Sequence, residues 1–156
     1  MHENNGKAKQ AMEFYTQIFP NSKIESILKY KDGGENNNEI PENVQHAQFV
    51  INNYILNCMD SSFNHSFDFS EGISLVVMTD TQEQTDYFWN SLISDGGRES
   101  MCGWLEDKYG VSWQITPKKL IELVSNSDPQ KSQKAFQAML QMKKIIIADI
   151  EKAYNS

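Results

Sequence analysis

The sequence is short of the residues that build disulfide frameworks and zinc fingers. Among its 156 residues are only two cysteines and three histidines. Cys58 and Cys102 are too few for a disulfide framework, and they do not have the spacing of a metal finger. We therefore expect a reduced, cytoplasmic setting for this chain.

Basic residues and long apolar runs are also scarce. The chain has 14 Lys and Arg against 21 Asp and Glu, a net charge of −7, which leaves no electrostatic footprint for nucleic acid or an anionic membrane surface. No apolar run approaches the roughly 18 residues of a membrane span, and the first ten residues have no signal-peptide core. We expect neither nucleic acid nor a membrane as a partner. The remaining composition, 39% hydrophobic, is that of an ordinary globular domain.

Residues 102–117, CGWLEDKYGVSWQITP, are the most informative stretch of the chain. Asp107 can open a type I turn, and Gly110 can take the positive φ that ends it. The residues after the turn alternate between apolar and polar side chains, which is the period of a strand. The stretch therefore predicts a β-hairpin.

An earlier hairpin is predicted at residues 44–60, with its turn at Asn52 and Asn53. Superposing the two turns places Asn53 on Gly110 and Asn57 on Gln114. The chain therefore contains two copies of one supersecondary unit.

The two copies define a first module at about 1–60 and a second at about 72–117, joined by a linker at 61–71. In the first module we expect a helix at 7–19, a strand at 22–30, a polar loop at 31–43 and the hairpin. In the second we expect a buried strand at 73–78 and then a helix that begins at a capping box, Thr81 to Gln84. Tyr87, Phe88 and Leu92 are its expected core face, and Gly96-Gly97 its end. A short strand at 98–102 leads into the second hairpin.

Residues 118–156 form a C-terminal helical extension. Asp128 caps and Pro129 begins a long C-terminal helix, which we expect to reach Tyr154. At 1.5 Å per residue this helix is roughly 38 Å long. Because that exceeds what a small domain needs to cover itself, we expect part of its apolar face to pack on a second subunit.

The chain resembles the PhnB-like branch of the glyoxalase/bleomycin-resistance/dioxygenase (vicinal oxygen chelate) superfamily, whose sequences are often labelled 3-demethylubiquinone-9 3-methyltransferase. The matching stretches are residues 11–24, 81–92, 102–117 and 142–154. The resemblance implies an α+β fold of two paired βαβββ modules, whose sheets curve around a concave cavity in a homodimer. The family's first strand is expected before Gly6, where only five residues are present, so the first module appears without it.

The resemblance also implies where a site should lie. In metal-using relatives, ligands come from the first and last strands of each module, and these positions correspond here to Asn57, Ser74 and Gln114. Alternation along the last strand adds Ser112 to the same face. Carboxamides and hydroxyls bind Zn²⁺, Ni²⁺ or Fe²⁺ poorly compared with His and Glu. We therefore predict cavity residues without a metal centre, with a divalent metal as the alternative.

Two further residues have a functional and a structural interpretation. His46 lies on a predicted strand and could act as a general base, although a single strand histidine is more often structural. Cys102 could present a reactive thiol beside Trp104, but no neighbouring base or helix N-terminus lowers its pKa in the sequence.

Two functions remain open. In the first, a cytoplasmic dimer without a cofactor binds a small metabolite or antibiotic-like molecule in its cavity. In the second, a metal-dependent glyoxalase- or dioxygenase-type enzyme acts on vicinal oxygens. Methyl transfer usually needs a glycine-rich turn between a strand and a helix to bind the methyl donor. Neither glycine pair suits this role, because Gly33-Gly34 lies in a polar loop and Gly96-Gly97 follows a helix.

Overall fold

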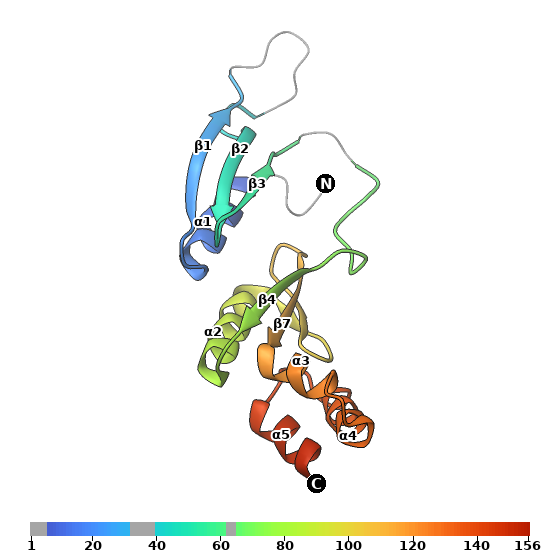
Figure 1. Cartoon of the computed structure of the whole chain (residues 1–156). Helices are drawn as coiled ribbons and strands as arrows, with labels where there is room; N and C mark the ends of the chain where they lie inside the picture. The colour runs from blue at the N-terminus through green and yellow to red at the C-terminus, as the bar shows by residue number, and fades with distance from the viewer. Residues whose placement is uncertain (1–5, 32–39, 62–64) are drawn as a thin grey trace. The chain divides into compact units, whose positions relative to one another are not determined.

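The computed structural model describes residues 6–31, 40–61 and 65–156. The chain divides into two compact units, residues 1–68 and 69–156, and the boundary falls inside the predicted linker. Each unit is described by itself (Figure 1). Most of the predicted loop at 31–43, part of the linker and the five residues before Gly6 lie outside the described residues, and so does the position of the expected first strand.

The first unit is one helix packed on an antiparallel sheet. Its strands lie in the order β1-β2-β3. The elements are α1 (Ala8–Ile18), β1 (Lys23–Lys29), β2 (Val44–Ile51) and β3 (Tyr54–Cys58). Tyr15 of α1 stacks on Phe49 of β2 with ring centroids 6.5 Å apart, so the face of the sheet that carries Phe49 is the one under the helix. The predicted helix, strand and hairpin of this module are confirmed.

Asp60 joins the start of the helix to the start of the central strand. Its side chain is only 4% exposed. One carboxylate oxygen accepts a hydrogen bond from the Ala8 amide at 3.1 Å, and the other accepts one from the Val44 amide at 2.9 Å. The Asp60 carbonyl also accepts a hydrogen bond from the Tyr30 hydroxyl at 3.1 Å. A buried carboxylate is stable only when its oxygens are paired in this way, so Asp60 fixes where α1 meets the sheet.

The second unit has a four-stranded sheet in the order β4-β7-β6-β5, in which β4 pairs parallel with β7. Its elements are β4 (Leu75–Thr79), α2 (Gln82–Leu92), the 3₁₀ turn η1 (Ser94–Gly96), β5 (Arg98–Glu99), β6 (Trp104–Glu106) and β7 (Ser112–Pro117). Strand, helix, strand and hairpin follow one another as predicted, and the mixed α+β fold is confirmed. The strand predicted at 98–102 is only two residues long.

Helix α2 begins as the sequence predicts, but its buried face differs. The Thr81 hydroxyl accepts a hydrogen bond from the Gln84 amide, and the Gln84 side chain reaches back to the Asp80 amide at 2.8 Å. The helix buries Thr85, Trp89 and Leu92, whereas Tyr87 is 50% exposed. The prediction that Tyr87 belongs to the core face was therefore wrong. The side of α2 that packs on the sheet is the one that carries Thr85, Trp89 and Leu92. The helix also ends at Leu92, four residues before the glycine pair.

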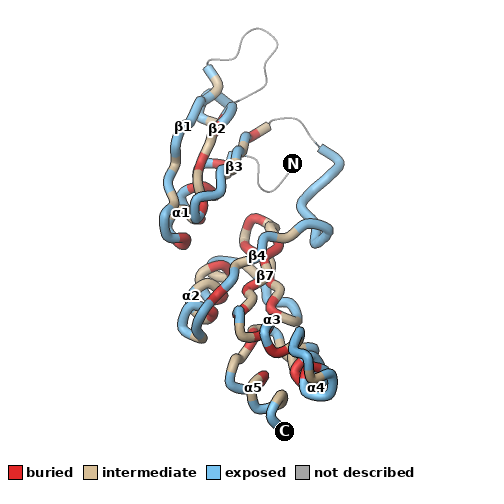
Figure 2. Tube along the Cα trace, in the orientation of Figure 1, coloured by how far each residue is buried: buried red, intermediate tan, exposed pale blue. Residues whose placement is uncertain are grey.

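The strand predicted to be buried at 73–78 is exposed. Val76 is 54% and Met78 46% exposed, and the strand appears partly pale blue in Figure 2. Thr79 alone is fully buried, where its hydroxyl hydrogen-bonds that of Thr85 on α2 at 2.7 Å. The sequence of β4 is that of an interior strand, but within the described residues β7 is its only strand partner.

The C-terminal extension folds as α3 (Lys118–Val124), α4 (Pro129–Met139) and α5 (Ile147–Asn155). The single helix predicted from Pro129 to Tyr154 is therefore wrong. The chain between α4 and α5 uses its backbone to hold the second unit: the amides of Cys102 and Gly103 donate to the carbonyls of Met142 and Lys143 at 2.6 and 2.7 Å. Carbonyls engaged with the sheet's hairpin are not available to continue a helix.

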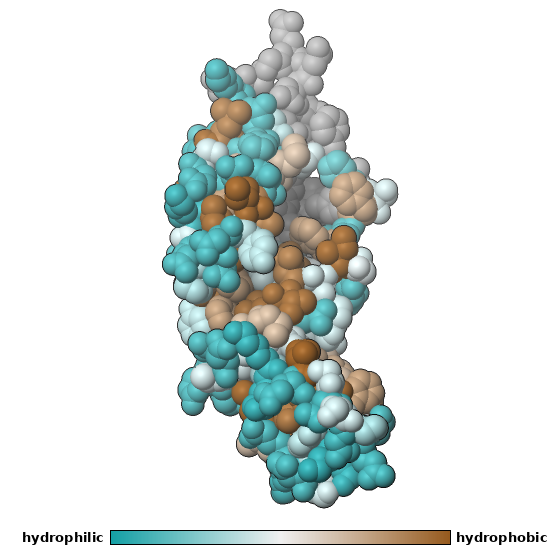
Figure 3. Space-filling model, in the orientation of Figure 1, coloured by the Kyte–Doolittle hydropathy of each residue, from teal (hydrophilic) through white to brown (hydrophobic). Residues whose placement is uncertain are grey.

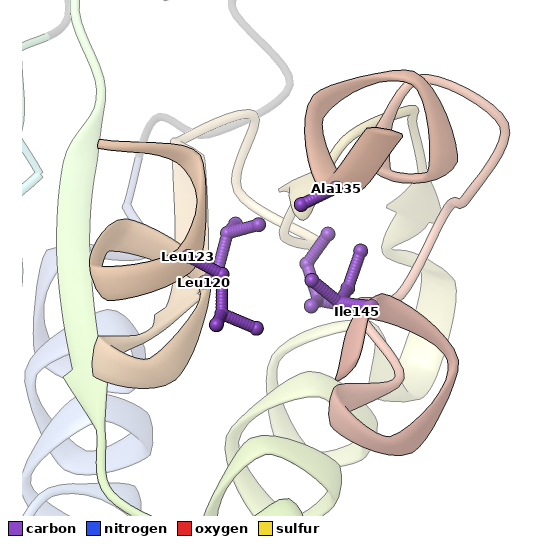
Figure 4. Close-up of a cluster of buried hydrophobic side chains, with 5 residues drawn as sticks. Leu120, Leu123, Ala135 and Ile145 are labelled. Atoms are coloured by element: carbon purple, nitrogen blue, oxygen red, sulfur yellow. The ribbon is translucent and has the colours of Figure 1, made fainter. Parts of the chain in front are cut away.

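Part of the apolar face predicted for the C-terminal helix packs within the chain, whereas Phe136 and Leu140 remain 41% and 37% exposed. Leu120 and Leu123 of α3 pack against Ala135 of α4, against Ile145 just before α5 and against Ile150 within it (Figure 4). The Gln82 side chain holds the same region to α2, because its carbonyl accepts a hydrogen bond from the Ile147 amide at 2.8 Å. No helix in the described residues is long and apolar enough to cross a membrane.

Replacing Asp60 tests the connection between α1 and β2. We expect Asp60→Ala to leave the amides of Ala8 and Val44 without acceptors and to reduce the stability of the first unit by about 2–3 kcal/mol. Hydrogen–deuterium exchange at these two amides measures the loss. Asp60→Asn keeps one acceptor oxygen and should fall between the two. Unchanged protection of both amides in Asp60→Ala would show that Asp60 does not have this role.

Candidate functional site

Among the described residues of the second unit, no helix covers one face of the sheet, which we call the helix-free face. Trp113 and Ile115 of β7 are 2% and 0% exposed on the opposite face, the one that meets α2. Alternation along β7 therefore places Ser112 and Gln114 on the helix-free face, as the sequence predicts. The turn before β7 is held by Asp107, whose carboxylate accepts hydrogen bonds from the Tyr109 amide and the Trp113 indole, both at 2.8 Å.

Two of the predicted site residues touch on this face. The Gln114 amide nitrogen donates a hydrogen bond to the Ser74 hydroxyl at 2.8 Å, and both side chains are half-buried. The contact depends on the pairing of β4 with β7, which sets Val76 opposite Gln114 and so brings Ser74, just before β4, within reach. The nitrogen of the Gln114 carboxamide is fixed by this bond, and among the described residues its oxygen has no hydrogen-bond partner.

Strand β6, which pairs with β7, adds an aromatic residue and a charged residue to this face. Trp104 of β6 lies opposite Gln114, and Glu106 lies opposite Ser112. Glu106 also binds Arg98 of β5, with 2.6 Å between carboxylate oxygen and guanidinium nitrogen. The hairpin register could have predicted both positions, because the turn at 107–110 fixes which residues of the two strands face each other.

Ser112 is buried, unlike the other predicted site residues. It is 3% exposed, and its hydroxyl has no hydrogen-bond partner among the described residues. The structure therefore places Ser112 in a buried position on the helix-free face, and its role in lining a cavity stays a prediction. A buried hydroxyl without a partner is costly, and such groups are often satisfied by a water or a ligand.

The first unit has a similar but more exposed face. Asn57 of β3 lies opposite Gln48 of β2, and the Gln48 amide donates to the Asn57 carbonyl at 3.4 Å. Ile55 is on the same face and 64% exposed, while Leu56 and Cys58 alternate to the α1 side. This agrees with the predicted alternation along the strand. Exposed apolar side chains of this kind appear as brown areas among teal in Figure 3.

His46 is exposed on β2 opposite Leu28 of β1. It lies on the same face as Gln48, two residues away, and at the far end of the strand from Ile51. Among the described residues, no hydrogen bond joins His46 to Asn57 or to Gln48.

The two cysteines differ in environment. Burial, and secondarily the Asp60 carboxylate, raise the pKa of the Cys58 thiol to about 11. Cys102 is half-buried in the turn before β6, with φ at 58°, and its amide is held by the Met142 carbonyl. It lies outside the row of Ser112 and Gln114.

The residues at the family's ligand positions do not fit a divalent metal. Asn57, Ser74 and Gln114 offer neutral oxygens, and the Ser74 hydroxyl already accepts a hydrogen bond from an amide. In the ranges that the structure describes, no three His, Cys, Asp or Glu side chains are grouped to hold a metal ion. We therefore derive no chemistry through a metal at these positions.

Solved structures resemble this chain over most of its length. A PhnB protein from Bacillus cereus, provisionally named 3-demethylubiquinone-9 3-methyltransferase, is 41% identical with a TM-score of 0.65, and the match covers 72% of this chain and 92% of that one. Protein PA1353 from Pseudomonas aeruginosa is 22% identical with a TM-score of 0.60, over 72% of this chain and 90% of that one, and shows the fold alone.

No curated protein matches the chain significantly. The model of the family described as 3-demethylubiquinone-9 3-methyltransferase matches residues 1–116, which include both modules and end just before the C-terminal extension. This match, together with the Bacillus cereus structure, shows that the chain belongs to this PhnB-like family of the glyoxalase/bleomycin-resistance superfamily.

Proposed function

We propose that this chain binds a small, partly apolar organic molecule on the helix-free face of its second sheet. The observation that carries the proposal is the hydrogen bond between Gln114 and Ser74, which holds a carboxamide in place at the centre of that face. A polar group fixed before the ligand arrives loses little entropy on binding, and small-molecule sites use a few such groups for orientation.

The surroundings of Gln114 supply apolar contact area. Trp104 lies beside it on β6 and Val76 on β4. Val76 and Met78 are about half exposed, so a ligand could remove their surface from water. Aromatic and aliphatic walls around one or two placed polar groups are typical of sites for small organic molecules. Ser112 adds a hydroxyl that still lacks a partner.

The metal-dependent alternative is supported less well by these residues. Isomerisation or dioxygen chemistry on vicinal oxygens uses a Lewis acid to stabilise developing charge. The positions that would hold it carry a hydroxyl and carboxamides, and Gln114 and Ser74 are bonded to each other. Binding by shape and hydrogen bonding needs no further group.

The family's methyltransferase name is not supported by the glycines of this chain. Nucleotide-type cofactors are commonly held by a glycine-rich turn from a strand into a helix. The turn from β4 into α2 consists of Asp80 and Thr81. At position 97 glycine is required by close packing instead. A Cβ on Gly97 would lie 2.8 Å from the Glu106 carbonyl oxygen and 2.6 Å from the Ile93 Cα.

Benzamide is a suitable probe, because it joins an amide to an aromatic ring. We expect titration of benzamide to shift the side-chain amide signal of Gln114 and the indole signal of Trp104 in nuclear magnetic resonance spectra. Gln114→Ala should weaken this binding about 3- to 10-fold, the usual value of one hydrogen bond. The matched control is Gln48→Ala, which removes a half-buried carboxamide from the other sheet. Equal weakening by both variants, or no shift at Gln114, would contradict the proposal.

The thiol of Cys58 gives a separate prediction. Because its pKa is raised to about 11, almost all of it is protonated at neutral pH, and only the thiolate reacts. In a Cys102→Ser variant, we expect the rate of alkylation by iodoacetamide to rise about tenfold per pH unit from 7 to about 10. A rate that levels off near pH 8 would show that the thiol is not buried as described.

A further inference from the structure

We propose that the ligand of the helix-free face of the second sheet is a primary amine, with its ammonium group held between the Glu106 carboxylate and the Gln114 carboxamide oxygen. This inference rests on the proposed function, because it concerns the same site, and it names the chemical class of the ligand. The residues that carry it all belong to the second unit.

The hydrogen-bond acceptors of Glu106 and Gln114 lie within reach of one ligand group. Glu106 of β6 is opposite Ser112 of β7, and Gln114 follows two residues later on the same face. Such diagonal neighbours in an antiparallel pair are about 7–8 Å apart, a distance that long side chains bridge. The Gln114 nitrogen is bonded to Ser74 on the β4 side, so the carboxamide oxygen lies on the side of β6. Because a carboxylate and this oxygen only accept hydrogen bonds, the ligand group between them is a donor.

Ser112 adds a third acceptor beside Glu106. Its hydroxyl is buried and has no hydrogen-bond partner among the described residues. A polar group so deeply buried is normally bonded to protein, water or a ligand, so Ser112 indicates that this part of the face receives a further polar group. A primary ammonium carries three N–H donors, one for each of Glu106, Ser112 and Gln114, whereas an alcohol carries one donor and a ketone none.

The charge around Glu106 also favours a cation. Glu106 is paired with Arg98, whose side chain is 71% exposed, while that of Glu106 is 26% exposed. The guanidinium is therefore the outer member of the pair, and an ion pair exposed in this way is weak. The hydrogen bond and charge of Glu106 raise the pKa of Arg98, and the charge of Glu71 raises it further. Two carboxylates thus share one guanidinium, so an ammonium that binds Glu106 leaves Arg98 with the charge of Glu71.

Trp104 and Val76 supply apolar walls for the rest of the amine. They lie on either side of Gln114, Trp104 on β6 and Val76 on β4. The face of an indole attracts a cation, and Trp104 lies two residues from Glu106 on the same side of β6. Because neighbouring strands are about 4.8 Å apart, the distance from β6 to β4 is about 10 Å, which suits an amine with one aromatic ring.

Benzylamine and benzamide test the inference as a matched pair. Both join a nitrogen to a phenyl ring through one carbon atom, and only benzylamine is charged at neutral pH. We expect the full chain to bind benzylamine about tenfold more tightly than benzamide, measured from the nuclear magnetic resonance shifts of the Gln114 amide and the Trp104 indole. Benzyltrimethylammonium keeps the charge but has no N–H donor, so it should lose most of this gain. Equal binding of the two cations would overturn the inference.

Replacing Glu106 tests the residue that carries the charge. Glu106→Gln keeps the size of the side chain and should lower the ratio of the benzamide to the benzylamine dissociation constant about tenfold. Glu99→Gln is the matched control, because Glu99 is the neighbouring carboxylate on the α2 side of the sheet, where it accepts a hydrogen bond from the Trp89 indole at 3.1 Å. The ratio should not change in this variant. Dispersed amide signals in the same spectra show that both variants are folded.

The outcomes separate this inference from the proposed function. If benzamide shifts the Gln114 signal but benzylamine binds no more tightly, the inference is overturned and the proposed function stands. If neither compound shifts the Gln114 signal, both are overturned. An equal change of the ratio in Glu106→Gln and Glu99→Gln also overturns the inference, because the preference for the amine then reflects only the net charge of −7.

Discussion

The parallel pairing of β4 with β7 is the interaction on which the candidate site depends. It brings Ser74 to Gln114 and makes β7 an interior strand. It also leaves β4 exposing Val76 and Met78 beside the carboxamide. The helix-free face of the second sheet is therefore polar at its centre and apolar along β4. That combination suits a small organic ligand better than a metal ion.

The two modules have the same arrangement of helix and sheet, but they differ in how firmly the carboxamide of the last strand is held. Both place a helix on one sheet face and a carboxamide of the last strand on the other, Asn57 in the first and Gln114 in the second. Gln114 is fixed by a 2.8 Å hydrogen bond across a parallel pair, whereas Asn57 has a longer contact of 3.4 Å to Gln48. The strand that completes the pairing in the second sheet has no counterpart among the described residues of the first. This difference motivates the choice of site.

The hairpins and the sheet faces on which Asn57 and Gln114 lie could be predicted because they follow from local chemistry. The turn residues at Asn52-Asn53 and Asp107–Gly110 determine the register of the two hairpins. The register determines on which face of its own sheet each carboxamide, Asn57 or Gln114, lies. The break between α4 and α5 could not be predicted, because residues 140–146 contain neither proline nor glycine. It results from tertiary hydrogen bonds to Cys102 and Gly103. The exposure of β4 could not be predicted either, because an apolar run indicates a strand but not how many neighbouring strands it has.

The measurement that tests the central claim most directly is native mass spectrometry of freshly purified protein in a volatile buffer without chelator. The account predicts that the protein carries no stoichiometric metal and that, under gentle activation, it retains an organic mass. It also predicts that the fraction of chains carrying this mass falls in Gln114→Ala and is unchanged in Gln48→Ala. One metal ion per chain, released by the same Gln114→Ala substitution, would contradict the account and assign the site to metal-dependent chemistry.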